Sequence, residues 1–250
     1  MKKKNPPAKI RKKSRKFENF NEKKYLKSLR RSGLSRKQQL DIFKEVNEKD
    51  YFSTTELHKE TYKALLKRSR VFAANYNIKQ AIYNLGPTGY PFEILCAEML
   101  KAKGFQTKVS VMKRGKFVRH EVDVMAKRAD LSIWCECKFH EKKTYKNDIK
   151  IPLYVHSRYL DLKEGNPNED FRYALISNTD FSKDAIRYAS GVGLLLYSMN
   201  HPKKGTFCDI IKKYKVYPIT ALKSLRVRDR KQLLEKGVVV IKQVQTEDLK

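Results

Sequence analysis

The stretch 131–140, LSIWCECKFH, alternates between two kinds of side chain with the period of two that is typical of a β-strand. The odd positions, from Leu131 to Phe139, are apolar residues or cysteines and predict a face that is buried in a core. Glu136 and Lys138 point to the opposite face, so a carboxylate and an ammonium lie side by side. An isolated Glu-x-Lys pair is most often an exposed ion pair of little energetic value, so its meaning depends on the surrounding sequence.

Two segments that precede this strand carry further acids. Glu93 lies in the first turn of a predicted helix that begins at Pro91 and ends at Gly104. Asp123 follows in a predicted β-hairpin. The predicted strands are residues 105–112, 117–125 and 131–140, and the first two are joined by a turn at 113–116. The order is therefore an acid on a helix, an acid on a hairpin and then Glu-x-Lys, which is much less expected by chance than Glu-x-Lys alone.

This ordered set suits the cleavage of a phosphodiester. Mg²⁺ prefers oxygen ligands and commonly takes one or two carboxylates, which Asp123 and Glu136 supply. Lys138 is the candidate to orient or help deprotonate the attacking water and to balance charge on the phosphate. Its protonation state is left open, because nearby carboxylates raise the pKa of a lysine and burial lowers it. Glu93 extends the acidic site.

After residue 140, helical and strand patterns alternate to the end of the chain. The predicted helices are 151–162 and 182–190, and the predicted strands are 171–177, 192–198 and a last one at 237–241. Asn178 and Thr179 end one strand, where they either contact a DNA backbone or cap the helix that begins at Ser182. The expected fold class is α/β, with a mixed β-sheet flanked by helices.

The N-terminal part of the chain is different. Residues 1–16 hold nine Lys or Arg and no acid, which is typical of a basic arm. Residues 17–86 carry helical patterns and predict a small, mainly helical domain. Turn-forming residues from Gly86 to Pro91 mark a boundary, so residues 87–250 form the second domain.

The composition indicates a folded protein that binds a polyanion. The chain has 250 residues, a formal net charge of +29 and 40% hydrophobic residues, too many for a disordered polycation. The sequence shows neither an apolar run long enough to span a membrane nor a signal peptide, so a cytoplasmic protein is expected. The four cysteines include no CxxC pair and are interpreted as reduced core residues, and the five histidines are too scattered for a zinc cluster.

The ordered set of acids and lysine resembles the PD-(D/E)xK nuclease superfamily, specifically its Mrr-like restriction-endonuclease branch. The matching blocks are residues 89–93 (GYPFE), 120–123 (HEVD) and 136–140 (ECKFH). Val122 stands where the superfamily name has proline, which is a common departure. Further blocks at 153–158, 177–182 and 217–222 are similar to those of bacterial proteins that join such a nuclease to an ATP-cone.

The resemblance implies roles for individual residues. Asp123 and Glu136 would be metal ligands, together with the backbone carbonyl of Cys137. Lys138 would be the catalytic lysine and Glu93 the helical acid. The implied fold of residues 87–250 is restriction-endonuclease-like.

The N-terminal region resembles an ATP-cone, a nucleotide-sensing module. The resemblance covers residues 10–13, 20–24, 28–33 and 75–81. It implies that Lys12, Lys13 and Lys24 contact the phosphates of ATP or dATP, although a solvated or DNA-facing role suits such basic residues equally well. The chain departs from the family at Ser14-Arg15, where a glycine usually shapes the first hairpin.

The sequence therefore predicts a DNA endonuclease that depends on Mg²⁺ or Mn²⁺, with a possible nucleotide effector. Cutting both strands with one site per chain would favour a homodimer. The alternative is an inactive nucleotide-sensing or DNA-binding regulator on a nuclease-like scaffold. An RNA-binding protein without activity would share the charge but leaves Glu-x-Lys unexplained.

Overall fold

The computed structural model describes residues 9–12, 15–47, 53–129, 131–222 and 225–244. The chain divides into two compact units, residues 1–78 and 79–250. The domain boundaries expected after residues 16 and 86 stay predictions. Among the described residues, no helix is both long and apolar enough to cross a membrane.

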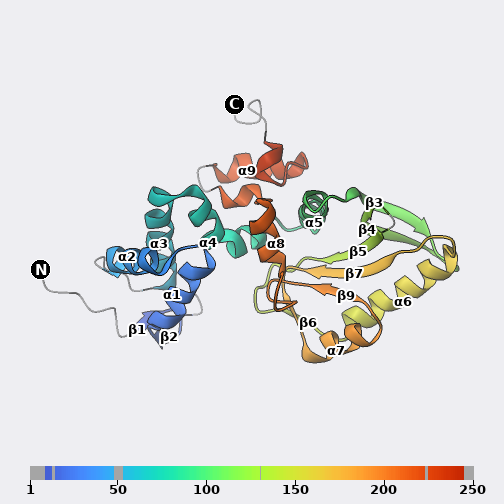
Figure 1. The fold of residues 1–250 in the computed structure, drawn as a ribbon, viewed down its shortest axis with the longest axis horizontal. Coiled ribbons are helices and arrows are strands. Elements are labelled where there is room, and N and C mark those ends of the chain that lie inside the picture. Colours follow the sequence, from blue (N-terminus) through green and yellow to red (C-terminus); the bar gives the residue numbers. More distant parts are fainter. Residues whose placement is uncertain (1–8, 13–14, 48–52, 130, 223–224, 245–250) are drawn as a thin grey trace, which may run out of the picture. The chain divides into compact units, whose positions relative to one another are not determined.

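The first unit combines a short hairpin with helices, as Figure 1 shows in blue to teal. Its elements are β1 (Lys9–Arg11), β2 (Phe17–Asn19), α1 (Glu22–Arg31), α2 (Arg36–Asn47), α3 (Thr54–Arg68) and α4 (Arg70–Tyr83), the last of which continues into the second unit. The two strands pair antiparallel. Arg15, in the turn between them, has φ +62°, the left-handed region that favours glycine.

Capping residues fix two of the helix starts in this unit. The side chain of Asn21 accepts a hydrogen bond from the backbone of Lys24 and caps α1. Ser53 and Glu56 form a reciprocal capping box at the start of α3. The apolar faces of these helices bury Leu29 and Leu65 in one core.

The second unit is built on a five-stranded mixed sheet. Its elements are α5 (Tyr90–Ala102), β3 (Gln106–Arg114), β4 (Arg119–Arg128), β5 (Leu131–Lys138), β6 (Lys146–Asn147), α6 (Lys150–Gly165), β7 (Arg172–Ser177), β8 (Asp180–Phe181), α7 (Lys183–Gly191), β9 (Leu195–Tyr197), α8 (Phe207–Tyr214) and α9 (Val227–Glu235). The strand order is β3-β4-β5-β7-β9. The first three strands are antiparallel, and β5, β7 and β9 run parallel. This confirms the expected α/β class with a mixed sheet.

Helices cover both faces of the sheet (Figure 1). On one face, Met99 of α5 and Ile210 of α8 border the same small cavity as Cys135. On the other face, Trp134 lies in one buried cluster with Val155 of α6 and with residues of α7. Both faces of β5 are therefore buried, and Glu136 lies on the face that packs against α6.

The β3–β4 hairpin bends sharply in its middle. The ladder between these strands is interrupted opposite Asp123, where Ser110 has φ +52°. Trp134 pairs with Met125 in the sheet, yet the ammonium of Lys113, near the far end of the hairpin, lies 5.0 Å from the Trp134 ring centroid. The outer half of the hairpin must therefore curl back over the sheet face that carries α6.

The tip of the curled hairpin is fixed to α6. Asp161 accepts hydrogen bonds from the backbone of Phe117 and from His120, at 2.9 and 2.7 Å. The fit is tight, because a Cβ added at Gly165, the last residue of α6, would lie 2.4 Å from the backbone of Gly115. No larger residue fits at this crossing without movement of the backbone.

One expected strand is wrong, and one strand pair was not expected. The strand expected at 237–241 is wrong: Val240 makes an isolated bridge with Pro218, and a 3₁₀ turn begins at Ile241. Ile219 donates to Val239 and Ile241 donates to Tyr217 on either side of this bridge, but both segments enter 3₁₀ turns at once, so the pairing extends no further. The short parallel pair of β6 and β8 was not predicted, because two-residue strands leave no periodic pattern.

Candidate active site

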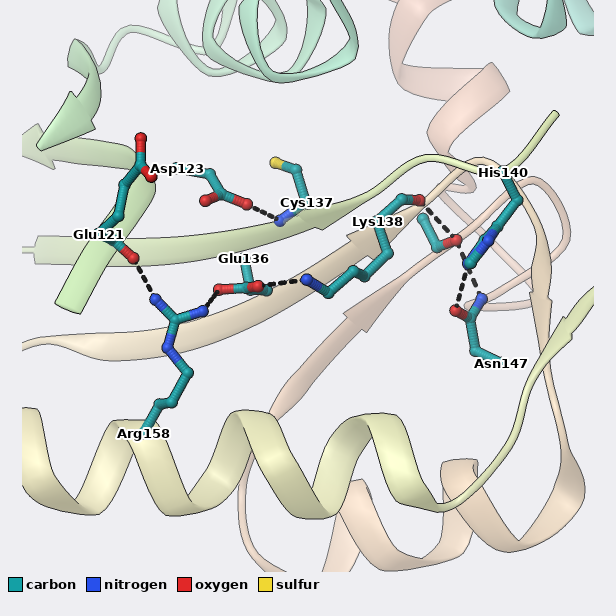
Figure 2. Close-up of polar contacts among 9 residues, drawn as sticks. Glu121, Asp123, Glu136, Cys137, Lys138, His140, Asn147 and Arg158 are labelled. Carbon is teal, nitrogen blue, oxygen red and sulfur yellow. Dashed lines mark hydrogen bonds and ion pairs between the residues drawn. The ribbon is translucent and has the colours of Figure 1, made fainter. Parts of the chain in front are cut away.

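The candidate site lies where β4 and β5 separate. The regular pairing of these strands ends at Val124 and Cys135. Beyond that point the carboxylate of Asp123 accepts a hydrogen bond of 2.6 Å from the backbone N–H of Cys137. This contact turns the Asp123 side chain toward β5, beside the Glu-x-Lys pair (Figure 2).

Glu136 is a buried carboxylate with two cationic partners. Its side chain is 2% exposed. One oxygen lies 2.6 Å from the Lys138 ammonium, and the other lies 2.5 Å from the Arg158 guanidinium. Figure 2 shows the carboxylate between these two side chains. Both partners are needed because an unpaired buried carboxylate is costly.

Arg158 joins α6 to both strands of the site. Its guanidinium also donates to the backbone carbonyl of Glu121 on β4 and lies 5.5 Å from the Tyr154 ring centroid. The sequence reasoning gave Arg158 no role. A signal was present, because the neighbours on the same helical stripe, Val155 and Leu162, are apolar and fully buried. An arginine on a buried stripe indicates a buried acidic partner.

Two acids of the site, Asp123 and Glu93, have raised pKa values. Burial, followed by the charge of Glu136, raises the pKa of Asp123 to about 7. Burial also raises the pKa of Glu93, and the charges of Glu121 and Glu136 add to the effect. Glu93 on α5 thus belongs to the same electrostatic cluster. Such a cluster has an excess of buried acid, which a cation would relieve.

Lys138 is protonated in this arrangement. Burial lowers its pKa, but the charge and the hydrogen bond of Glu136, together with the charge of Asp123, outweigh that effect and raise the pKa overall. The resting state left open by the sequence is therefore the ammonium form. In this form Lys138 cannot accept a proton, but it can stabilise negative charge or orient a water molecule.

A buried polar network fixes the end of β5. His140 exchanges two backbone hydrogen bonds with the side chain of Asn178, both 2.8 Å long. The His140 ring contacts Asn147, whose amide nitrogen lies 3.0 Å from the Ser177 hydroxyl. Asn178 therefore neither caps α7, a role that Ser182 fills, nor faces outward. The network holds the chain rigid just after Lys138.

The residues present suit a divalent cation in their chemistry. Asp123 and Glu136 offer carboxylate oxygens, the ligands that Mg²⁺ prefers, and a bound cation would offset the burial and the neighbouring charge that raise the pKa of Asp123. Within the described residues, however, no three His, Cys, Asp or Glu side chains are grouped as a metal cluster. To bind a metal ion, Glu136 would have to give up its ion pair with either Lys138 or Arg158.

The predicted nucleotide-binding lysines lie in the first unit. Lys24 borders a hollow of about 360 Å³, together with His58 and Tyr76. The ammonium of Lys12 is 2.5 Å from Glu18, so it already has an acidic partner. Lys13 lies outside the described residues. The assignment of these lysines to phosphates stays a prediction.

The remaining cysteines agree with their interpretation as core residues. All four, Cys96, Cys135, Cys137 and Cys208, are buried, and no disulfide joins any of them in the described part of the chain. Burial raises the pKa of the Cys137 thiol well above its usual range, so it is held protonated.

The fold and site define the second unit as a mixed α/β domain with a buried acid–lysine cluster at the edge of two separating strands. The chain belongs to the same family as an uncharacterized protein from Archaeoglobus fulgidus, with which it is 33% identical over 127 residues, 51% of this chain and 71% of that protein. No family model matches the chain.

Two solved structures are similar to this one. The crystal structure of a protein of unknown function, AF1548, matches with a TM-score of 0.55 and 29% identity, over 62% of this chain and 82% of that chain. The MspJI restriction endonuclease in complex with a 27-mer oligonucleotide gives a TM-score of 0.40 and 14% identity, over 67% of this chain and 36% of that chain.

Proposed function

We propose that the protein is a metal-dependent DNA endonuclease. The observation that carries the proposal is the convergence of Asp123, Glu136 and Lys138 at the point where β4 and β5 separate. Asp123 accepts a hydrogen bond of 2.6 Å from the backbone N–H of Cys137, and the Lys138 ammonium lies 2.6 Å from the Glu136 carboxylate. The same residues are the metal ligands and the lysine that the resemblance to PD-(D/E)xK nucleases implies. Glu93 contributes to their electrostatic field.

A divalent cation, Mg²⁺ or Mn²⁺, would be held by Asp123, Glu136 and the backbone carbonyl of Cys137. When bound, such a cation lowers the pKa of its water and stabilises negative charge on a phosphate. Lys138 remains an ammonium group that orients the attacking water and balances charge on the phosphate oxygens. Arg158 holds the Glu136 carboxylate in place between α6 and β5.

DNA is the proposed substrate because of the charge of the chain. A formal net charge of +29 gives affinity for phosphates that does not depend on sequence and that weakens steeply with salt. Specific base recognition would add contacts to the grooves.

The test is DNA cleavage by the full chain. Wild-type protein with Mg²⁺ or Mn²⁺ is expected to nick or linearise plasmid DNA, and EDTA should stop the reaction. Lys138→Ala should still bind DNA but lose about 10²-fold or more in cleavage rate. Lys183→Ala serves as the control, because it removes an exposed lysine of α7 and lowers the net charge by the same amount as Lys138→Ala. Equal cleavage by Lys138→Ala would remove the catalytic assignment.

A second candidate function is a DNA-binding or nucleotide-sensing regulator without nuclease activity. One observation favours it: both carboxylate oxygens of Glu136 are already paired with cations. Calorimetric titration of the protein with Mn²⁺ separates the candidates. Saturable binding that Asp123→Asn abolishes supports the nuclease, whereas no binding at millimolar Mn²⁺ supports the regulator.

We also propose that the first unit binds ATP or dATP through Lys12, Lys13 and Lys24. Support comes from the hollow that Lys24, His58 and Tyr76 border, which combines a cation with aromatic rings. Bound nucleotide should raise the melting temperature of wild-type protein. Lys24→Ala should remove this shift and Lys37→Ala, on α2, should retain it. If ATP and dATP leave the wild-type melting temperature unchanged, this proposal fails.

A further inference from the structure

The tip of the β3–β4 hairpin displays apolar side chains to solvent. Phe117 is 71% exposed and Val118 is 54% exposed. Three exposed basic residues surround them, namely Arg114, Lys116 and Arg119. Phe117 is among the most exposed large apolar side chains of the described residues, and with Val118 it forms an apolar pair within a basic turn.

The tip is held in one conformation. The backbone N–H of Gly115 donates to the carbonyl of Val118 at 2.7 Å, and Phe117 donates to Asp161 at 2.9 Å. Lys116 donates its backbone N–H to the Asp161 carbonyl and pairs through its ammonium with Glu164, at 3.0 and 2.6 Å. The same ammonium lies 5.0 Å from the centre of the Phe117 ring. Exposure of the ring is thus built into the fold rather than caused by a loose loop.

Two arginines face each other across the base of this turn. Arg114 and Arg119 are directly opposite in the β3–β4 ladder. Like charges in this position destabilise a hairpin, and neither guanidinium has an acidic partner among the described ion pairs. A polyanion bound at the tip would relieve the repulsion.

The tip is attached to the candidate site through α6. Asp161 holds the tip and Arg158 holds Glu136, and these two residues are one helical turn apart, about 4.5 Å along the axis. The hairpin tip and the candidate site are therefore held by the same stretch of α6.

We propose that the hairpin tip is a DNA-binding wedge. Phe117 and Val118 insert against bases of duplex DNA and partly unstack a base step, while Arg114 and Arg119 bind the flanking phosphates. This inference rests on the proposed function, because it assigns the tip to the same DNA substrate. It adds a contact to bases, which charge alone does not provide.

The test compares variants of the full chain for binding to a labelled DNA duplex without divalent metal. Phe117→Ala should weaken binding about 5- to 100-fold, the range expected for loss of one aromatic contact with a base, and should leave the salt dependence unchanged. Arg114→Ala with Arg119→Ala should instead lower the slope of log Kd against log salt by up to about 2. Val227→Ala, which trims a side chain of α9 that is 74% exposed, should bind as the wild type does.

A second measurement detects contact with bases directly. Trp134, the single tryptophan, is fully buried, so Phe117→Trp adds one exposed indole. Its fluorescence should be quenched when duplex DNA binds, and wild-type fluorescence should change little.

The outcomes separate the two proposals. If wild-type protein binds and cleaves DNA but Phe117→Ala binds as tightly as Val227→Ala and Phe117→Trp is not quenched, the wedge is wrong and the endonuclease stands. If single-stranded DNA quenches the fluorescence of Phe117→Trp and duplex DNA does not, the proposal of a wedge for duplex DNA is also overturned. If wild-type protein does not bind DNA, both proposals fail.

Discussion

The guanidinium of Arg158 and the carboxylate of Glu136 are 2.5 Å apart, although 22 residues separate them in the chain. Lys138 holds the other oxygen of the same carboxylate at 2.6 Å. Glu136 is therefore a buried charge that is compensated twice. Any metal ion that uses Glu136 must compete with one of these two partners.

Arg158→Met should separate stability from metal affinity. Without metal, Glu136 keeps only one cationic partner, so the free energy of unfolding should fall by about 1–3 kcal/mol. With Mn²⁺ present, the loss should become smaller, because the metal no longer competes with a guanidinium. Urea unfolding with EDTA and with Mn²⁺ measures both effects. An equal loss in the two conditions would contradict the competition.

The pKa of Asp123 predicts a pH effect on the metal-free protein. Its pKa is raised from 3.8 to about 7 by burial and by Glu136. Between these two values the folded protein keeps a proton that the unfolded chain has lost, so this residue lowers stability as pH rises through the window. Asp123→Asn has no such proton. In EDTA, the variant should therefore gain stability relative to wild type from about pH 5 to about pH 8, measured by urea unfolding. A constant difference would show that Asp123 is already ionised at about pH 5.

The close crossing of the hairpin and α6 predicts that residue 165 must be glycine for full stability. Gly165→Ala would place a methyl group 2.4 Å from the backbone of Gly115, so the melting temperature should fall by several degrees. Gly191, the last residue of α7, has open space around its Cα, and Gly191→Ala should be neutral or slightly stabilising. Thermal unfolding monitored by circular dichroism checks both. Similar melting temperatures for the two variants would mean that the hairpin can move away from α6.

The bend of the hairpin predicts that substitutions of Ser110 by valine and by glycine differ in their effect on stability. Its φ of +52° is accessible to glycine and strongly disfavoured for a β-branched residue. Ser110→Val should therefore destabilise the protein by more than 1 kcal/mol relative to Ser110→Gly. Chemical denaturation of the two variants gives the comparison. If valine is tolerated as well as glycine, the bend does not depend on this residue.

Much of the architecture could be predicted from periodicity. The helix starts at Asn21 and Ser53 follow from capping residues, and β5 follows from the alternation in residues 131–138. The curl of the hairpin could not be predicted, because it depends on a left-handed serine in a segment that otherwise reads as a regular strand. The strand expected at 237–241 failed because 3₁₀ turns begin at Ile219 and Ile241 and limit the pairing to one bridge.

The candidate site was only partly accessible to sequence reasoning. The spacing of Glu136 and Lys138 placed them on one face of a strand, and the structure has them in contact. Arg158 was missed because its partner lies on another element, and no local pattern states which acid a buried arginine meets. The same holds for Asn147, which looks like a loop residue in the sequence but is fully buried.

The burial of the cysteines has a practical consequence. All four thiols belong to residues 79–250, and all are shielded from solvent. A maleimide added under native conditions should therefore modify the protein only as fast as that unit opens. The four thiols thus report conformational opening of residues 79–250, while residues 1–78, which contain no cysteine, do not react with the reagent.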